Sequence, residues 1–305
     1  MVVSERPRTV GTAPWQLDGS ICMPDAERCP GLVLIHGSGA NDRDHRVGAT
    51  RIFRDLAHGL AARGVAVLRY DKRTFAYRER LASRLDDDLT LHEEAVVDAR
   101  AALAVLRQEP NVDDRRLFLF GYSLGGLAAP RVALLDGGLR GLVIAAATLR
   151  PLEERLLEQI RYLAALDGPN ARRARRALPQ AERDVKRIKD IVGGAPPLLD
   201  ERLLERSPTY WLDLARHQPA AILASLGLPL LVIHPERDYQ VTDGDLHAWR
   251  ESSAQLPGLE LRSYPGLNHS LVFGTEASSP DEHEKPTRIS DDVPNDVARW
   301  IHSCC

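Results

Sequence analysis

The sequence lacks the features that mark membrane, secreted or nucleic-acid-binding proteins. None of its apolar runs approaches the roughly 20 residues that a membrane-spanning helix needs, and residues 1–10 contain no apolar segment typical of a secretory signal. A net charge of −3 over 305 residues gives no basic surface for nucleic acid or anionic lipid. We therefore expect a cytoplasmic monomer or homodimer with no nucleic-acid or membrane partner.

Cysteines and metal-binding motifs are also scarce. A disulfide between Cys22 and Cys29 could form, but reduced thiols are expected in a chain without a signal sequence, and only four cysteines occur in all. The ten histidines contain no His-x-x-x-His or His-Glu-x-x-His pattern, so no metal site is predicted. The glycine-rich turn at 36–39 is not followed by the Gly-Lys-Ser/Thr of a phosphate loop, and no cofactor is predicted.

Short apolar runs alternate with amphipathic segments along most of the chain. Continuously apolar runs of this length are typical of strands buried on both faces of a parallel sheet. Such strands are predicted over residues 31–36, 65–68, 117–120, 141–147 and 230–234. A first strand is predicted over 15–23 and a final strand over 259–264. Strands alternating with helices indicate an α/β fold with a doubly wound, mostly parallel sheet. Residues 1–12 are predicted to be disordered or loosely attached.

The alternation stops between residues 149 and 205. Leu152, Leu156 and Ile160 recur at helical spacing there, and an arginine-rich stretch follows over 171–189. Because a connection of this length is seldom unstructured, it is predicted to be a helical cap, or lid, inserted after strand 6. The core then comprises 1–148 and 206–305. The arginines could attract an acidic substrate or form the solvated face of the cap helices.

One glycine-rich turn has the sequence of a nucleophile elbow. Ser123 lies in Gly121-Tyr122-Ser123-Leu124-Gly125, between an apolar strand and a stretch of small residues expected to be helical. In such an elbow the serine hydroxyl projects above the sheet, and the glycines avoid collisions with the neighbouring strand and helix. The first N–H groups of the helix then point at the group that the serine attacks.

The partners of this serine are predicted at other strand ends, because functional groups collect at the carboxyl edge of open α/β sheets. His269 follows the last predicted strand and would be the general base, while Asp238 follows the strand before it and would orient the imidazole. Asp243 and Asp245 are alternative acids, farther from a strand end. Backbone N–H groups of Ser38 and Leu124 would stabilise the oxyanion.

Other residues near these strand ends have supporting roles in this hypothesis. His36, Gly37 and Tyr122 are candidate substrate-pocket residues, and His36 could also support the loop that carries Ser38. Asp71 and Arg73 are interpreted as ions that anchor a loop.

These motifs resemble one family. The matching segments are 34–44, 69–73, 121–126, 236–241 and 264–269, and the likeness covers nearly everything after about residue 14. Together they resemble the bacterial EstD-like esterase branch of the α/β-hydrolase superfamily. The resemblance implies a serine carboxylesterase with a helical cap and a Ser123–Asp238–His269 triad. Two departures are Tyr122, where a histidine often precedes the nucleophile, and the arginine-rich cap, which has no counterpart.

The sequence therefore predicts a cofactor-independent serine hydrolase that cleaves small-molecule esters through an acyl-enzyme. A thioesterase, or an acyltransferase or cyclase of small-molecule biosynthesis, would use the same three side chains on an ester or thioester. A peptidase is a further possibility within the enzyme class. The alternative of another class is a ligand-binding protein that has kept the fold and lost the chemistry.

Overall fold

The central strands are buried on both faces, as their continuously apolar sequences predict. In strand β3 (Cys29–Ile35), Leu32 and Leu34 pack into one apolar cluster while Val33 and Ile35 pack into another. Successive residues of a strand face opposite sides. One apolar run therefore supplies core residues to both faces of the sheet, and helices cover each face.

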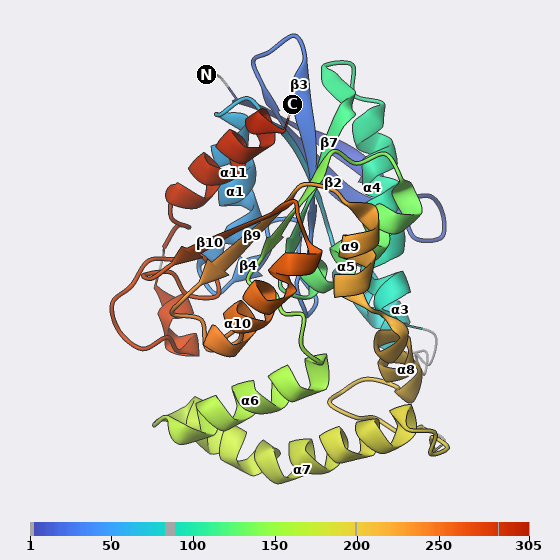
Figure 1. Ribbon diagram of the computed structural model, residues 1–305, viewed down its shortest axis with the longest axis vertical. Coiled ribbons are helices and arrows are strands. Elements are labelled where there is room, and N and C mark those ends of the chain that lie inside the picture. The colour runs from blue at the N-terminus through green and yellow to red at the C-terminus, as the bar shows by residue number, and fades with distance from the viewer. Residues whose placement is uncertain (1–2, 83–88, 199, 286, 305) are drawn as a thin grey trace.

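The computed structural model describes residues 3–82, 89–198, 200–285 and 287–304, and its main sheet has eight strands (Figure 1). The order is β1-β2-β6-β3-β7-β8-β9-β10; β1, β2 and β6 pair antiparallel, and every neighbouring pair from β6 to β10 is parallel. The predicted doubly wound, mostly parallel sheet is thus confirmed. The other strands are β1 (Val3–Val10), β2 (Leu17–Pro24), β6 (Ala66–Tyr70), β7 (Val112–Tyr122), β8 (Gly141–Ala145), β9 (Leu230–Pro235) and β10 (Leu259–Tyr264), with a small separate pair β4 (Arg46–Val47) and β5 (Thr50–Arg51).

Helices flank the sheet on both sides (Figure 1). α1 and α11 pack together against one face, and α4 and α5 pack against the other. The helices are α1 (Ile52–Ala61), α2 (Arg73–Ala76), α3 (Arg78–Ala82), α4 (Val97–Arg107), α5 (Leu124–Asp136), α6 (Leu152–Ala165), α7 (Pro169–Val192), α8 (Pro208–Arg216), α9 (Pro219–Leu226), α10 (Asp243–Ser252) and α11 (Asp292–Ser303). A π-helical turn η1 (His92–Val96) precedes α4, and short 3₁₀ turns η2 (Ser253–Gln255) and η3 (Pro280–Glu284) lie near the C-terminal end.

The prediction for the N-terminal residues was wrong. Val3 to Val10 form β1, an edge strand paired along its whole length with β2. Arg8 also makes a two-pronged ion pair with Glu109. Most β1 side chains are exposed, so the strand shows no apolar run, and backbone pairing holds it in place.

Both cysteines that could have formed a disulfide are buried free thiols. Cys22 lies on β2 and Cys29 on β3, and burial raises the pKa of Cys22 to about 11. A raised pKa keeps the thiol protonated and unreactive at neutral pH.

Helices α6 and α7 form a pair that lies beyond one end of the sheet, at the bottom of Figure 1. The pair follows β8, the sixth strand of the main sheet in chain order. The arginines 172, 173, 175, 176 and 183 of α7 are all exposed, which favours the interpretation of a solvated helix face. Trp211 of α8 packs with Ile188 and Ile191 of α7, so apolar packing continues past residue 205.

Candidate active site

Ser123 occupies the tight turn between β7 and α5, with φ 53° and ψ −118°. Such a conformation costs on the order of 1–3 kcal/mol and persists only where the surroundings impose it. Here Ser123 N donates to Ala145 O at 2.9 Å, and a Cβ at Gly121 or Gly125 would lie within 3.0 Å of backbone atoms. The two motif glycines are therefore required sterically, as the elbow motif predicts.

His269 and Asp238 meet although they follow different strands. His269 Nδ1 lies 2.6 Å from Asp238 Oδ2, and Asp238 Oδ1 accepts a hydrogen bond of 2.7 Å from Gln240 N. A carboxylate can only accept, so Nδ1 carries the proton and Nε2 of a neutral ring is left as an acceptor. The Tyr122 hydroxyl donates to His269 O at 2.8 Å, which fixes the backbone of this turn.

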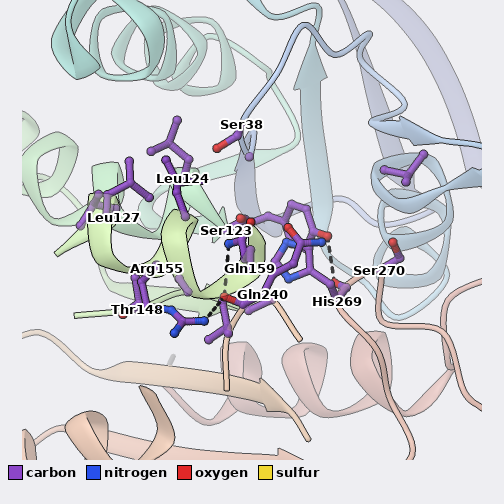
Figure 2. A pocket seen from close by; sticks show the side chains of 18 of the residues that line it. Ser38, Ser123, Leu124, Leu127, Thr148, Arg155, Gln159, Gln240, His269 and Ser270 are labelled. Carbon is purple, nitrogen blue, oxygen red and sulfur yellow. Dashed lines mark hydrogen bonds between the residues drawn. The ribbon is translucent and has the colours of Figure 1, made fainter. Parts of the chain in front are cut away.

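Ser123 and His269 line the same cavity, whose volume is about 190 Å³ (Figure 2). Gly37 approaches the serine so closely that a Cβ there would lie 3.2 Å from Ser123 Cβ. Leu124 is the first residue of α5, where backbone N–H groups have no partner within the helix. The predicted residues that line the cavity are Gly37, Ser38, Tyr122, Ser123, Leu124 and His269.

His36 does not line this cavity, which corrects its assignment as a pocket residue. It is almost fully buried below the loop, with Nε2 2.5 Å from Tyr70 O and Nδ1 3.0 Å from His45 Nδ1. Burial lowers the pKa of His36 to about 3, so the ring is neutral and donates Nε2–H to the carbonyl. His45, which the sequence interpretation missed, does line the cavity.

A buried lysine supports the loop from below. Lys72 Nζ donates to Gly37 O at 2.8 Å and to Glu94 Oε1 at 2.5 Å, and both side chains are at most 2% exposed. The second Glu94 oxygen accepts from Arg206 and from the Tyr210 hydroxyl, each at 3.0 Å. Burial raises the pKa of Glu94, but the charges of Lys72 and Arg206 outweigh burial and hold it below its usual value.

The neighbours of Lys72 anchor this region, as their strand-end positions predict. Asp71 Oδ1 accepts hydrogen bonds from Arg43 N and Arg43 Nε, at 2.8 and 3.0 Å. Arg73 forms a buried ion pair with Asp98 at 2.6 Å.

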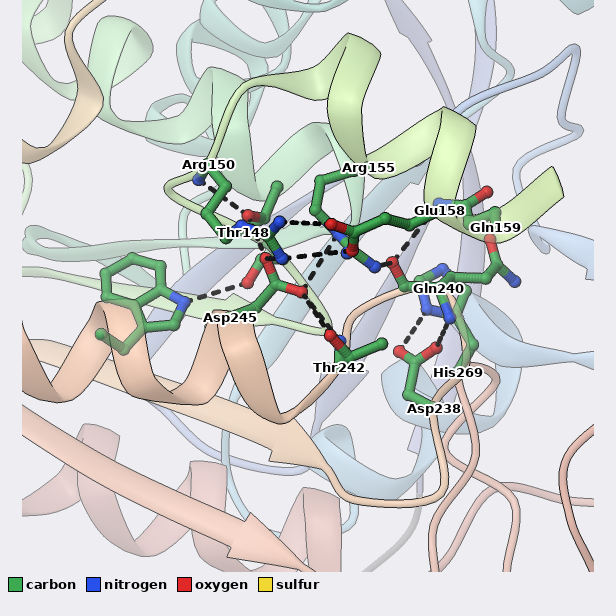
Figure 3. A network of polar contacts seen from close by, with 12 residues as sticks. Thr148, Arg150, Arg155, Glu158, Gln159, Asp238, Gln240, Thr242, Asp245 and His269 are labelled. Carbon is green, nitrogen blue, oxygen red and sulfur yellow. Dashed lines mark hydrogen bonds and ion pairs between the residues drawn. The ribbon is translucent and has the colours of Figure 1, made fainter. Parts of the chain in front are cut away.

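Asp245, one of the two alternative acids, pairs with Arg155 and is connected to Asp238 through Arg155 and Gln240 (Figure 3). It is fully buried, lies 3.1 Å from Arg155 Nε, and accepts from Thr148 Oγ1 at 2.5 Å and Thr242 N at 2.8 Å. Arg155, from helix α6, also donates to Gln240 O at 2.5 Å. One residue, Gln240, thus contacts both α6 and Asp238.

Among the described residues, one cluster of side chains has the composition of a possible metal site. Glu5, Cys22 and His58 place ligand atoms within 4.8 Å of one another. The Arg69 guanidinium already lies there, 2.7 Å from Glu5 Oε1 and 3.4 Å from Cys22 Sγ. A cation in this position repels a metal ion, so the group does not fit one.

Comparison with known proteins decides the family. A model of the alpha/beta hydrolase family matches residues 32–282. The chain belongs to this family. It is 34% identical over 288 residues to Esterase EstD of Thermotoga maritima, an alignment that covers 93% of this chain and 65% of EstD. The chain therefore spans about two thirds of the length of that curated relative, and the resemblance expected from sequence is confirmed at the level of the family.

Solved structures agree on the fold. Est1E from Butyrivibrio proteoclasticus has a TM-score of 0.61 at 17% identity, with 98% of each chain covered. A proline iminopeptidase of Mycobacterium smegmatis gives the same TM-score, identity and coverage. Because the solved structures that share this fold include an esterase of Pyrococcus furiosus (TM-score 0.58, 14% identity, 98% of this chain and 91% of that chain covered) as well as this iminopeptidase, the fold alone does not choose the substrate. In the described part of the chain, no helix has the length and apolar character to cross a membrane.

Proposed function

We propose that this chain is a serine esterase that cleaves small-molecule carboxylic esters through an acyl-enzyme on Ser123. The observation that carries the proposal is the 2.6 Å contact between His269 Nδ1 and Asp238, made by a histidine that shares its cavity with an elbow serine. The name of the 34% identical relative, Esterase EstD, supports ester rather than peptide substrates.

The proposed mechanism starts from Nε2 of His269, the ring nitrogen that carries no proton. Nε2 removes the Ser123 hydroxyl proton as Oγ attacks the ester carbonyl, and Asp238 stabilises the imidazolium that forms. Backbone N–H groups of Leu124 and Ser38 stabilise the negative oxygen of the tetrahedral intermediate. The imidazolium then protonates the leaving alcohol, and a water molecule, activated by His269, hydrolyses the acyl-enzyme.

The segment 149–205 is proposed to act as the cap of this site. Four residues of α6 line the catalytic cavity: Leu152, Arg155, Leu156 and Gln159. Their position indicates that the cap helps to select the substrate. A cytoplasmic location and a monomeric or dimeric state remain predictions.

The first test is hydrolysis of p-nitrophenyl butanoate. We expect an initial burst of nitrophenol in the wild type, and a kcat lowered by at least about 10⁴-fold in Ser123→Ala, because no other group replaces the nucleophile. Ser225→Ala, at an exposed serine of α9, is the matched control and should be fully active. Substantial turnover by purified Ser123→Ala would refute the mechanism.

A further inference from the structure

The catalytic cavity has leucines on one side, next to Thr148 and Arg155, and His269 and Ser270 on the other side. In Figure 2, Ser123 lies between Leu127 on one side and His269 and Ser270 on the other. On the His269 side, Ser270 Oγ lies 3.4 Å from His283 Nδ1. The leucine wall consists of residues from α5 and α6: Leu124, Leu127, Leu152 and Leu156.

The proposed chemistry orients an ester along this axis. His269 must protonate the leaving oxygen, so the alcohol part of the ester lies on the side of His269. The acyl part then extends from Ser123 along the leucine wall. An apolar chain is the group that gains from leaving water there.

A second cavity, of about 390 Å³, begins on the far side of this wall. Leu127 and Leu152 line both cavities, so the two cavities adjoin at these flexible side chains. The other apolar lining residues come from α7, α8, the start of α9 and the segment leading to α6: Leu149, Pro151, Ile188, Val192, Trp211, Leu214, Ala215 and Pro219.

The two basic residues that line the second cavity, Arg150 and Lys189, already have acidic partners. Arg150 pairs with Glu158 at 3.2 Å, and Lys189 pairs with Glu154 at 2.6 Å. An anionic group is therefore not required to neutralise them. The catalytic cavity alone is smaller than the roughly 300–1,000 Å³ typical of ligand sites, whereas the second cavity lies within that range.

We propose that the second cavity receives the distal part of the acyl chain. The substrates are then esters of medium- or long-chain aliphatic acids with a small or polar alcohol. This inference rests on the proposed esterase function, because the acyl-enzyme on Ser123 sets the direction of the chain.

The test compares p-nitrophenyl butanoate, octanoate and dodecanoate. Each methylene buried contributes up to about fourfold in kcat/KM, so octanoate should exceed butanoate at least about tenfold in the wild type. Ala215→Trp, at an exposed position of α8 that lines the second cavity, should lower the dodecanoate-to-butanoate ratio of kcat/KM at least about tenfold.

A ratio measured on one preparation does not depend on the fraction of folded enzyme. Val192→Trp places the same bulk in the cavity from α7 and should have the same effect, whereas Ala224→Trp, exposed on α9 outside both cavities, should leave the ratio unchanged. A flat or falling chain-length profile, or unchanged ratios in both cavity variants, would overturn this inference while leaving the esterase assignment intact. Failure to hydrolyse any ester would instead refute the proposed function.

Discussion

Lys72 is the residue whose role is least visible in the sequence. Its ammonium group is buried below the loop that carries Ser38, where it bonds the Gly37 carbonyl and Glu94. A hydrogen bond that involves a charged group is stronger than a neutral one, and burial increases its effect. Lys72 therefore fixes the backbone from which the second oxyanion donor is proposed to project.

Replacing Lys72 with Met should lower kcat for an aryl ester by about 10- to 100-fold with little change in KM, because a displaced oxyanion donor weakens transition-state binding most. In this variant Glu94 keeps Arg206 and Tyr210 as partners, so a fraction of the protein molecules should still fold. Rates are normalised to serine sites titrated with a phosphonate. Lys186→Met, at an exposed lysine of α7, is the control. An unchanged kcat in Lys72→Met would exclude a positioning role.

The triad candidates could be predicted from sequence because each follows a strand within a local motif. The elbow motif around Ser123 is marked by glycines within two residues, and the structure places His269 against Asp238, as expected. Lys72 could not be assigned in this way. Its partner Glu94 lies in a π-helical turn 22 residues away, and no periodicity predicts which charges meet in the interior.

Among the elements, α6 links the proposed cap to the turn that holds Asp238 (Figure 3). Arg155 donates to Gln240 O, while Gln240 N donates to Asp238 Oδ1. The turn that holds Asp238 is thus fixed from the cap side. Docking of α6 should therefore affect the orientation of the Asp238–His269 pair as well as substrate access.

Arg155→Met should lower kcat by about tenfold, because loss of the Gln240 contact loosens the turn that orients His269. The low-field proton NMR signal of His269 Nδ1–H, which reports the bond to Asp238, should weaken or shift. Arg155→Lys keeps a positive charge beside buried Asp245, but a lysine cannot reach both Asp245 and Gln240 O. This variant should therefore fold and show the same changes in kcat and in the NMR signal. Arg161→Met, at an exposed position of α6, is the control. A wild-type signal and kcat in both Arg155 variants would contradict the coupling.

Element boundaries were predicted best where a strand is marked locally. The last strand was predicted over 259–264, as observed. β1 was missed because an edge strand with exposed side chains has no apolar signature. α8 was also not predicted, since its burial depends on packing against α7.

On the scale of the whole molecule, the fold encloses neutral histidines. His36 and His45 bond each other below the loop that carries Ser38, and burial lowers the pKa of both, to about 3 for His36. In the unfolded chain both would titrate near their ordinary value of 6.5. At pH values between the lowered pKa of the folded state and 6.5, the unfolded state therefore binds more protons than the folded state.

The free energy of unfolding should fall as the pH drops below about 6.5 and continue to fall towards pH 3, with each such histidine contributing up to about 1.4 kcal/mol per pH unit. His36→Gln, whose amide can still donate to Tyr70 O, should show a shallower decline. Urea unfolding at a series of pH values checks this, with the exposed His247→Gln as control. Equal slopes for wild type and His36→Gln would show that this histidine is not responsible.

The central claim is that Ser123, His269 and Asp238 act as one catalytic unit. Labelling of the folded enzyme with a fluorophosphonate, followed by peptide mass spectrometry, tests it most directly. We predict a single adduct on Ser123, formed at least about 10³-fold more slowly in His269→Ala because the proton acceptor is gone. An adduct on another residue, no adduct at all, or equal labelling rates in the two proteins would contradict the account.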